Sequence, residues 1–410
     1  MTRLVLKFGG TSVADTDCIE RAAIKIAAEI ARGHQIAVVV SAMAGMTNDL
    51  IEYCRQISPL HDAQEYDAVV ANGENITAGL MAMALQKRGI AARSWQGWQV
   101  PVLCTDRHGK ALILDIEITE MEKRIGKGEV PVLAGFQGIS SHRRVTTLGR
   151  GGSDTTAVAL AAALGAERCD IYTDVDGVYT ADPRIVPHAR KLGKVSYEEM
   201  LEMASLGAKV LQTRSVEIAM KQNVPVQVLS SFKDRIGSDF PGTLVTREDD
   251  IVEQEIVNGI AYTKDEAKIS LVGVHDLPGV AAGIFGSMIE AAINVDMIVQ
   301  NISHDGTAVD ITFTVARSDL PRALNALQKC KELDGTEIRS DEDIVKVSVI
   351  GIGMRSHAGV AQTMFKALAE KGINIQVIST SEIKISVLLA AEYAELAVRA
   401  LHAAYGLESK

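Results

Sequence analysis

Residues 4–12 read Leu4-Val5-Leu6-Lys7-Phe8-Gly9-Gly10-Thr11-Ser12 and predict a short buried strand that ends in a tight turn. Two successive glycines let a backbone approach a bulky ligand, because no Cβ stands in the way. Such a turn exposes backbone N–H groups, and Lys7 with two hydroxyl side chains adds further donors, which suits phosphate oxygens. An ordinary Gly-Gly turn beside a surface lysine is the alternative that this stretch alone leaves open.

The following residues predict a β-α-β unit. Apolar side chains recur at helical spacing over residues 16–32, Gly33 ends that helix, and Ile36–Val40 form a continuous apolar strand. Two later segments repeat the apolar strand, residues 130–134 and 169–172. Such strands are typical of a parallel sheet with helices on both faces. We therefore predict an α/β domain over residues 1–232, an αβα sandwich with a mostly parallel sheet, in which Pro225–Ser230 is the last strand.

Polar side chains follow the predicted strands, where ligands of such sheets bind. Ser41 and Thr47 are small hydroxyl residues that suit a compact polar ligand, although Thr47 or Asn48 could instead cap a helix. Glu74 lies at the start of an apolar helix, where it could cap the helix or bind an ammonium group. The residues leave both choices open.

A second glycine-rich segment runs Thr146-Thr147-Leu148-Gly149-Arg150-Gly151-Gly152-Ser153-Asp154-Thr155-Thr156-Ala157. Three glycines surround Arg150 just before an Ala-rich helix, which indicates a backbone nest for anions at a helix N-terminus. The guanidinium of Arg150 also matches a carboxylate. A purely structural helix start seldom needs this density of glycine, hydroxyl and opposed charge, so we interpret the segment as a ligand site.

A third polar segment follows the strand over residues 169–172. It contains six candidate ligand contacts: Thr173, Asp174, Tyr179, Asp182, Pro183 and Arg184. Acidic, aromatic and basic groups in one loop suit a nucleotide, and a solvated turn is the alternative. Farther on, residues 207–211 predict the opening of a helix with Lys209 near its start. A lone lysine there would most often be a surface charge.

Beyond a predicted connector at residues 233–260, the chain repeats itself. Residues 268–295 and 346–375 share three residue types at one offset: Gly279 and Gly359, Phe285 and Phe365, Asn294 and Asn374. Each copy predicts strand, helix, strand, strand, helix, which is typical of a ferredoxin-like α+β module. We place the modules at residues 261–340 and 341–410. Two copies are too few for a solenoid and suit a paired regulatory unit.

Composition excludes several classes of protein. The 42 basic and 52 acidic residues give a net charge of -10 without a basic run, which argues against a nucleic-acid partner. No apolar run reaches the roughly 18 residues of a membrane span, and no leader precedes the first strand, so we expect a cytoplasmic protein. The five cysteines and nine histidines lack paired spacing, which predicts neither a disulfide framework nor a metal site.

Three motifs in this order resemble the aspartate kinases of the amino-acid-kinase superfamily: residues 7–12, residues 149–154 and residues 173–184. The repeat resembles the tandem ACT domains of that family, so the similarity covers essentially the whole chain. It implies ATP-dependent phosphorylation of the β-carboxylate of L-aspartate to 4-phospho-L-aspartate. That reaction is the entry step to lysine, methionine and threonine synthesis.

The resemblance also implies roles for the nucleotide-binding residues. Lys7 and the amides of Gly9 and Gly10 would hold the transferring phosphoryl group, Lys209 would approach from the nucleotide side, and Mg²⁺ would be held mainly by the phosphates. Asp154 would orient the lysines and the glycine-loop amides. The nucleotide would be surrounded by Ser12, Thr173, Asp174, Tyr179, Asp182, Pro183 and Arg184.

For aspartate, the resemblance implies that Arg150 binds the α-carboxylate and Glu74 the ammonium group, while Ser41 and Thr47 complete the pocket. A carboxylate is already ionised at pH 7, so no general base is required. Another carboxylate kinase of the superfamily, such as that of N-acetylglutamate, is an alternative against which Glu74 and the tandem repeat argue. A non-catalytic amino-acid sensor is a second alternative, against which the two predicted phosphate lysines, Lys7 and Lys209, argue.

The ACT pair, by the same resemblance, would bind lysine, threonine or both between the modules and join chains into a homo-oligomer. Candidate contacts in the first module are Asp276, Gly279, Val280, Asn294 and Gln300, and those in the second are Asn374, Ile375 and Ser381. The first module has Pro278 before its glycine and the second lacks this proline, so the two sites differ. A separately initiated regulatory half would need a start codon other than Met, because no methionine lies between Met220 and Met288.

Overall fold

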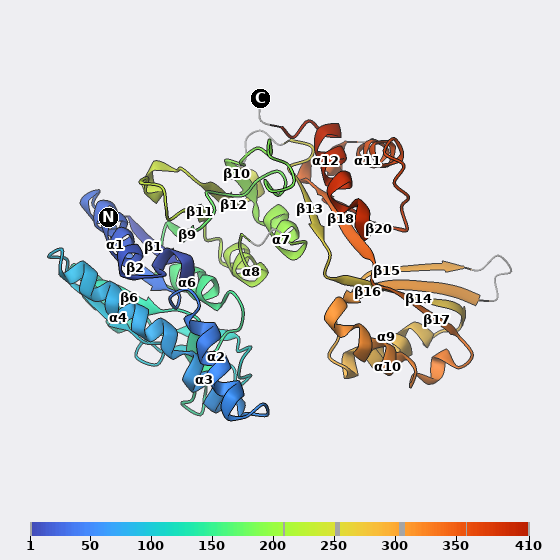
Figure 1. The fold of residues 1–410 in the computed structure, drawn as a ribbon. Coiled ribbons are helices and arrows are strands. Elements are labelled where there is room, and N and C mark those ends of the chain that lie inside the picture. Colours follow the sequence, from blue (N-terminus) through green and yellow to red (C-terminus); the bar gives the residue numbers. More distant parts are fainter. Residues whose placement is uncertain (1, 208–209, 251–254, 303–307, 358, 409–410) are drawn as a thin grey trace. The chain divides into compact units, whose positions relative to one another are not determined.

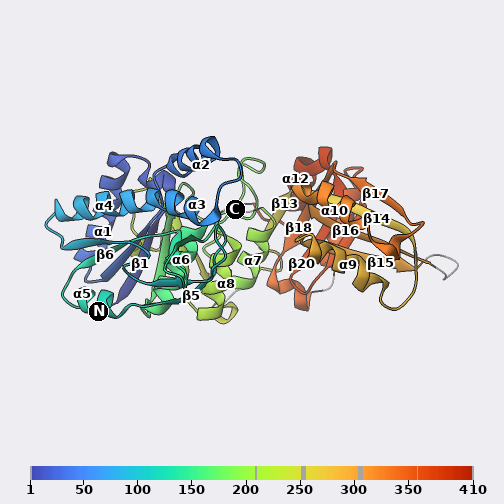
Figure 2. The ribbon, with the colours of Figure 1, turned by 90° about the horizontal axis from the view of Figure 1, so that it is seen from below.

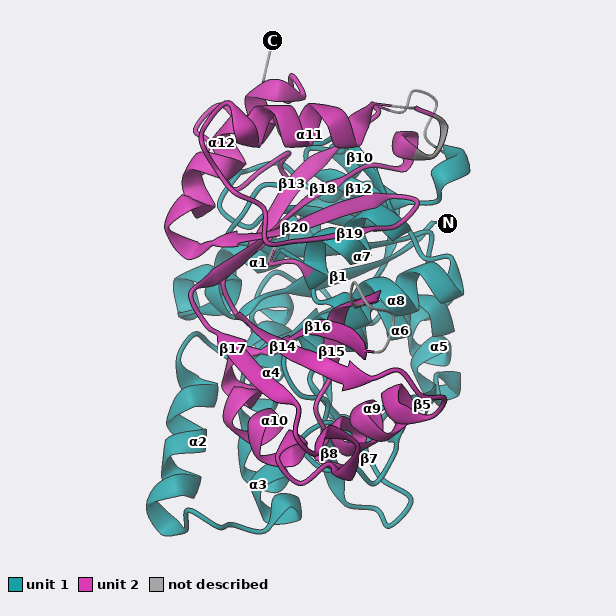
Figure 3. Ribbon diagram, turned by 90° about the vertical axis from the view of Figure 1, so that its right-hand side faces the viewer, with its two compact units in different colours: residues 1–178, 191–205, 209–253 teal, residues 179–190, 206–208, 254–410 magenta. Residues whose placement is uncertain are grey.

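The computed structural model describes residues 2–207, 210–250, 255–302, 308–357 and 359–408 (Figure 1). The chain divides into two compact units (Figure 3). The first comprises residues 1–178, 191–205 and 209–253, and the second comprises residues 179–190, 206–208 and 254–410. A short segment from within the predicted N-terminal domain, residues 179–190, therefore folds with the C-terminal part of the chain.

An eight-stranded sheet forms the centre of the first unit, in the order β10-β12-β11-β9-β1-β2-β6-β3. Its strands are β1 (Arg3–Phe8), β2 (Gln35–Val40), β3 (Ala92–Trp95), β6 (Val130–Ala134), β9 (Arg168–Thr173), β10 (Lys194–Ser196), β11 (Val226–Ser230) and β12 (Thr243–Thr246). Every neighbouring pair is parallel except β11 with β12. The predicted mostly parallel sheet is confirmed.

Strand β12 corrects the predicted end of this sheet. It lies in the stretch 233–260 and pairs antiparallel with β11, so the prediction that residues 225–230 form the last strand is wrong. The strand is only 4 residues long and directly follows Gly242. Its place depends on pairing with β11 and β10, which the local sequence does not reveal.

Helices cover both faces of the sheet, as Figure 2 shows for α1, α4, α6 and α8. Leu4, Leu6 and Phe8 of β1 belong to the apolar core beneath α1 (Thr16–Ala31) and α4 (Asn72–Gln86). Because successive strand residues point to opposite faces, Lys7 points to the other face. There α6 packs against β1, and α8 packs against α6. The predicted αβα sandwich is confirmed.

The first unit contains further elements around this sandwich. A smaller sheet has the order β5-β4-β7-β8. Its strands are β4 (Val102–Cys104), β5 (Ile113–Ile116), β7 (Gln137–Ile139) and β8 (Val145–Thr147). The other helices are α2 (Met46–Ile57), α3 (Ala63–Val70), α5 (Thr119–Ile125), α6 (Gly152–Ala163), α7 (Tyr197–Ser205), α8 (Thr213–Gln222) and the short 3₁₀ helices η1 (Gly10–Val13), η2 (Gly237–Asp239) and η3 (Glu248–Asp250).

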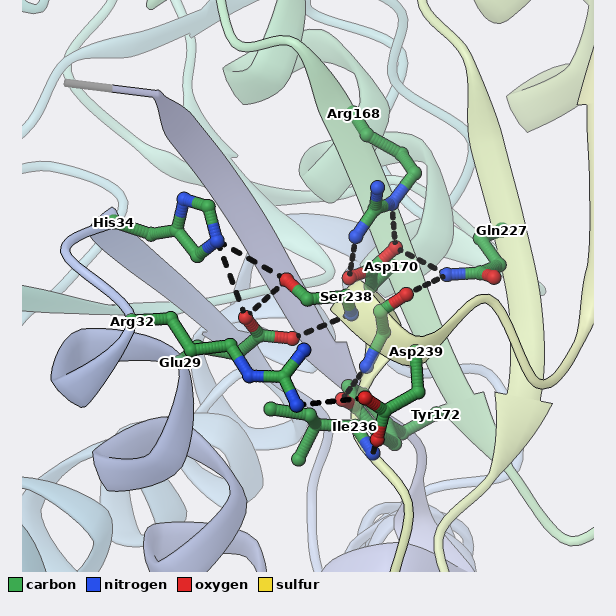
Figure 4. Close-up of polar contacts among 11 residues, drawn as sticks. Glu29, Arg32, His34, Arg168, Asp170, Tyr172, Gln227, Ile236, Ser238 and Asp239 are labelled. Carbon is green, nitrogen blue, oxygen red and sulfur yellow. Dashed lines mark hydrogen bonds and ion pairs between the residues drawn. The ribbon is translucent and has the colours of Figure 1, made fainter.

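A buried polar network holds η2 against the amino ends of β9 and β11 (Figure 4). Arg168 donates two hydrogen bonds to Asp170 (2.5 and 3.0 Å), and Gln227 joins Asp170 to the backbone of η2. Ser238 donates its N–H and hydroxyl to Glu29 of α1 (2.9 and 2.5 Å). Both carboxylates are fully buried. Much of the stretch predicted as a connector is thus fixed to the first unit by buried charges.

The second unit contains two four-stranded antiparallel sheets, each with two helices. The first module comprises β14 (Glu266–His275), α9 (Val280–Glu290), β15 (Val295–Ile302), β16 (Ala308–Ala316), α10 (Leu320–Leu327) and β17 (Glu337–Asp341). The second comprises β13 (Gly259–Thr263), β18 (Ile344–Ile350), α11 (Val360–Ala369), β19 (Val377–Thr380), β20 (Lys384–Ala390) and α12 (Ala394–Ala404). The predicted repeat of two α+β modules is confirmed.

Strand β13 belongs to the second module although it precedes the first module in the sequence. It pairs with β18 of the second module, while β17 pairs back with β14. The first module is therefore inserted between the first and second strands of the second module's sheet. Lys346 of β18 joins them, because its buried ammonium contacts Glu266 of β14 and Asp296 of β15 (2.7 Å to Asp296).

The Asp170 network predicts a stability effect confined to the first unit. Asp170→Asn would leave the buried guanidinium of Arg168 without its counter-ion, so we expect the free energy of unfolding to fall by about 3 kcal/mol. Urea unfolding followed by tryptophan fluorescence measures this directly, because the two tryptophans of the chain, Trp95 and Trp98, both lie in the first unit.

The matched control is Asp239→Asn, which removes an exposed partner of Arg32 in the same network. Exposed ion pairs contribute little, so its unfolding midpoint should stay close to that of the parent protein. Equal midpoints for the Asp170 and Asp239 variants would show that the buried pair does not stabilise this unit.

Candidate active site

The carboxyl ends of β11, β9, β1 and β2 meet at one edge of the first unit's sheet. Three backbone hydrogen bonds link the segments beyond these ends: Gly9 N–H to Tyr172 O (3.0 Å), Ser41 N–H to Phe8 O (3.1 Å) and Ser231 N–H to Thr173 O (2.9 Å). Because parallel strands all end on this side, loops distant in sequence become neighbours. The candidate residues of the first unit gather along this edge.

Lys7 forms the central ion pair of this site. Its Nζ lies 2.5 Å from Oδ1 of Asp154, at the start of α6, and both residues are buried. A buried ammonium is stable only with compensating charge, so Asp154 fixes both the charge and the direction of Lys7. The structure thus brings Lys7 and Asp154 together at this edge of the sheet.

The glycine turn after β1 is closely packed. A Cβ on Gly10 would lie 3.0 Å from the carbonyl oxygen of Ala42, so only glycine fits there without displacing the neighbouring loop. Ser12, in η1, donates its hydroxyl to the carbonyl of Tyr172 (3.1 Å) and accepts from the hydroxyl of Ser231 (2.5 Å). The turn is therefore held from two sides by β9 and by the segment after β11.

Glu74 is buried in the first turn of α4 and does not cap that helix. Its Oε1 accepts from the N–H of Ala42 (3.0 Å), while Oε2 has no hydrogen-bond partner among the described residues. Burial raises the pKa of Glu74 to about 7, against the opposing effects of the Ala42 N–H and the positive charge of Lys7. The capping alternative is wrong, and one buried oxygen is left for a further donor.

Thr47 and Asn48 do not cap a helix either. Helix α2 begins at Met46, with Gly45 at the N-cap position, where φ is 86°, and without a side-chain hydrogen bond. The capping alternative for these two residues is therefore wrong. Ser41 and Thr47 both remain partly exposed on the segment that follows β2.

Arg150 lies exposed in the loop between β8 and α6. Gly149 and Gly151 on either side have φ of 77° and 69°, a left-handed conformation that favours glycine. A Cβ on Gly151 would also overlap the side chain of Gln212, at 1.7 Å. Within the part of the chain that the structure describes, Arg150 has no hydrogen bond or ion pair, so its guanidinium is free for a ligand.

The third predicted segment divides between the two units after Val178. Thr173 and Asp174 stay with the first unit, where the Thr173 hydroxyl donates to Asp174 (3.1 Å). The four remaining candidates, Tyr179, Asp182, Pro183 and Arg184, belong to the second unit. Arg184 pairs with Asp182 (2.7 Å), and this guanidinium holds the pKa of that carboxyl below its usual value.

Residues 179–190 are anchored to the second module by a separate core. Ala181, Ile185 and Val186 belong to the apolar cluster of that module. The buried hydroxyl of Thr180 lies 2.9 Å from Nε2 of His402 on α12 and donates to the carbonyl of Leu407. The segment is therefore an integral part of the second unit.

Lys209 lies outside the described residues. The helix predicted to open at residues 207–211 begins only at Thr213, as α8. The prediction of that helix start is wrong, because residues 210–212 form a turn and an extended approach to α8.

The predicted effector residues lie in or next to helices and strands of the two modules. Gly279, with φ of 99°, and Val280 start α9, Asn294 precedes β15 and Gln300 lies within it. Asp276 is exposed before α9, and Asn374 and Ile375 precede β19. Ser381 lines a cavity of about 460 Å³ in the second module, together with Met354, His357, Gly359, Val360 and Ile385.

Sequence reasoning missed Ser231 and Lys233, which follow β11. Ser231 holds Ser12, and Lys233 pairs with Asp176 in the loop after β9 (2.5 Å). The rule that function lies just beyond each parallel strand would have found both residues. Lys233 lies in the stretch predicted as a connector, and Ser231 lies between that stretch and the predicted strand 225–230.

The described residues contain no group of three or more His, Cys, Asp or Glu side chains that could hold a metal ion. Among the same residues, no helix has the length and apolar character needed to cross a membrane.

Comparison with known proteins identifies the class. Residues 2–230 match the amino acid kinase family, and residues 269–330 and 347–405 match the ACT domain. The parallel-sheet unit with its glycine turn is thus the kinase part, and the repeated α+β modules are ACT domains.

An aspartate kinase of Pseudomonas putida is 53% identical over 411 residues, which cover 100% of this chain and 98% of that protein. The E. coli aspartokinase III in complex with aspartate and ADP (R-state) is 28% identical with a TM-score of 0.82, over 98% of this chain and 99% of that chain. Its complex with lysine and aspartate (T-state) gives a TM-score of 0.74 at the same identity, over 98% of each chain. The chain therefore belongs to the aspartate kinase family, and not to the N-acetylglutamate kinases.

The raised pKa of Glu74 predicts a pH-dependent stability. A folded-state pKa of about 7, above the ordinary 4.5, means that the native state binds the proton more tightly than the unfolded state. Stability is therefore lost as pH rises from 4.5 to about 7. Glu74→Gln has no carboxyl group to titrate at this position. The free energy of unfolding of the variant, minus that of the parent protein, should therefore rise by about 2 kcal/mol between pH 5 and pH 8.

Urea unfolding followed by tryptophan fluorescence at both pH values measures this difference. The pH 5 comparison is the internal reference, because it contains every effect of the substitution that does not titrate. A difference that stays constant with pH would contradict the raised pKa of Glu74.

Proposed function

We propose that this kinase transfers the γ-phosphoryl group of ATP to the β-carboxylate of L-aspartate and so forms 4-phospho-L-aspartate. The observation that carries the proposal is the buried Lys7–Asp154 pair beside the Gly9-Gly10 turn, at the carboxyl edge of a parallel sheet. The E. coli relative that binds aspartate and ADP supports the choice of both substrates. The reaction is the entry step to lysine, methionine and threonine synthesis, and we propose that it takes place in the cytoplasm.

Phosphoryl transfer needs positioning and charge neutralisation more than covalent chemistry. Lys7 supplies a fixed positive charge, because Asp154 holds its ammonium 2.5 Å away and limits its movement. The amides of Gly9 and Gly10 would bind phosphoryl oxygens, since a turn without side chains lets those oxygens approach the backbone. Lys209 would add a second positive charge from the nucleotide side.

A magnesium ion would be held mainly by the phosphates of the nucleotide. When bound, Mg²⁺ neutralises charge on the phosphates.

The aspartate pocket would combine Arg150 and Glu74. Arg150 is exposed and offers a planar fork to the α-carboxylate. Glu74 is buried with one free oxygen, and an ammonium group would both satisfy that oxygen and favour the ionised carboxylate. Ser41 and Thr47 would complete the pocket. No general base is needed, because the attacking β-carboxylate is ionised at pH 7.

For the nucleotide, we propose contacts from Ser12, Thr173, Asp174, Tyr179, Asp182, Pro183 and Arg184, as the family resemblance implies.

Regulation would depend on lysine, threonine or both, bound by the ACT modules, which would also join chains into a homo-oligomer. The complex of the E. coli relative with lysine supports an amino-acid effector. The predicted contacts are Asp276, Gly279, Val280, Asn294 and Gln300 in the first module, and Asn374, Ile375 and Ser381 in the second. The cavity beside Ser381 has room for a small amino acid.

Lys7→Ala tests the catalytic part of the proposal. Loss of the fixed positive charge should reduce aspartate-dependent ADP release from Mg²⁺-ATP by about a thousandfold. The matched control is Lys346→Ala, which removes another buried, ion-paired lysine, in the second unit, and should keep turnover near that of the parent protein. Unchanged turnover in the Lys7 variant would refute its role.

The same assay with lysine, threonine or both added tests the regulatory part. Suppression of turnover by either amino acid identifies the effector. Turnover without suppression would retain the kinase and reject the proposed effector sites. No turnover of the parent protein with any amino-acid acceptor would favour the non-catalytic sensor.

A further inference from the structure

A fully buried carboxylate of α3, Asp67, lies outside the catalytic residues described above. It accepts hydrogen bonds from three residues: His108 Nδ1 (2.7 Å), Gly109 N–H (3.1 Å), Thr147 N–H (3.0 Å) and Thr147 Oγ1 (2.6 Å). An ionised carboxylate only accepts, so Nδ1 of His108 carries the proton. One side chain thus ties the loop before β5 to the end of β8.

Arg214 of α8 binds the same two segments through their carbonyl groups. It donates to the carbonyl of Leu148 (2.9 Å) and to that of Ala111 (2.7 Å). Between these contacts, the N–H of Ala111 donates to the carbonyl of Thr147 (3.0 Å). A negative side chain from one helix and a positive side chain from another therefore hold one pair of segments, residues 108–111 and 147–148.

This pair of segments leads directly into the loop of Arg150. A Cβ on Gly149 would lie 3.0 Å from the carbonyl oxygen of Gly109, so the loop rests on the segment that Asp67 holds. Arg150 itself has no hydrogen bond or ion pair with the described residues. The position of its guanidinium is therefore set by the backbone on which it is carried.

We propose that Asp67 and Arg214 are positioning residues for the substrate carboxylate, acting through Arg150. Charge-assisted hydrogen bonds are stronger than neutral ones, so two ionised side chains can hold this loop more rigidly than amides or hydroxyls would. The inference rests on the proposed role of Arg150 toward the α-carboxylate of aspartate. We expect the effect of both residues to be confined to the amino-acid substrate, because none of their hydrogen bonds given above reaches the glycine turn after β1.

Asp67→Asn keeps the shape of the side chain but sets an amide NH₂ against donors, so it should loosen the Arg150 loop. We expect KM for aspartate to rise about tenfold while KM for ATP changes less than about twofold. Thr147→Val removes one hydroxyl donor at nearly constant shape and should raise KM for aspartate by a smaller factor. If the Asp67 variant does not fold, the Thr147 variant carries the test.

The matched control is Asp170→Asn, which alters another fully buried, hydrogen-bonded carboxylate at the amino ends of the strands. It should lower stability and leave both KM values unchanged. A rise in KM for aspartate in this control equal to that of Asp67→Asn would overturn the inference, because any loss of stability would then have the same effect. Unchanged KM for aspartate in the Asp67 and Thr147 variants would also overturn it.

A double-mutant cycle with Arg150→Ala separates this inference from the proposed function. If Asp67 acts through Arg150, Asp67→Asn should add little to the effect of Arg150→Ala on KM for aspartate. If the double variant raises KM for aspartate by the product of the two single factors, the inference is overturned and the role of Arg150 remains intact. Arg150→Ala with unchanged KM for aspartate would instead refute the role of Arg150 itself, and the inference with it.

Discussion

The first unit depends on how it accommodates a buried positive charge. Lys7 lies within a strand whose alternate residues are core, and an ammonium in that position is costly unless a carboxylate and a ligand compensate it. Asp154 supplies the carboxylate from α6, which lies on the face of the sheet opposite α1 and α4. The glycine turn, the serine contacts that hold it and the start of α6 all follow from bringing these two residues to the same edge of the sheet.

Charges elsewhere in the chain follow the same pattern. Asp170 and Arg168 compensate each other at the amino ends of the strands, and Lys346 does so with Glu266 between the two modules. Glu74 is different, because its pKa is raised and one of its oxygens lacks a partner. Glu266 also has one oxygen without a hydrogen-bond partner, but its other oxygen is paired with Lys346. Among the described residues Glu74 has no such ion pair, which supports the proposed role of its free oxygen toward an ammonium group.

Local sequence patterns predicted much of this fold. Continuous apolar strands and Gly33 identified the β-α-β unit, and a fixed offset between glycine, phenylalanine and asparagine identified two ferredoxin-like α+β modules. The patterns could not predict β12 or the pairing of β13 with the second module, because both depend on which distant strand is available for pairing. They also missed the division after Val178, since a short polar segment does not reveal which core its few apolar residues will enter.

Positions that require glycine were predictable where chemistry and backbone geometry coincide, as at Gly10 or Gly151. Two capping alternatives, at Thr47 and Glu74, could not be decided because capping depends on where a helix begins, and single sequences place helix ends poorly. Ser231 was missed because the stretch after it was predicted as a connector, whereas this stretch contains strand β12 of the sheet.

The segment 179–190 has a consequence for recombination between family members. Its apolar residues Ala181, Ile185 and Val186 pack in the apolar core of the second module, yet they are encoded within the kinase half of the gene. A chimera that joins the first 232 residues to foreign ACT domains would pair this segment with a core it was not selected to fit. A chimera that exchanges the ACT domains should therefore also exchange residues 179–190. The part of the gene that encodes the regulatory unit is thus divided into separate segments.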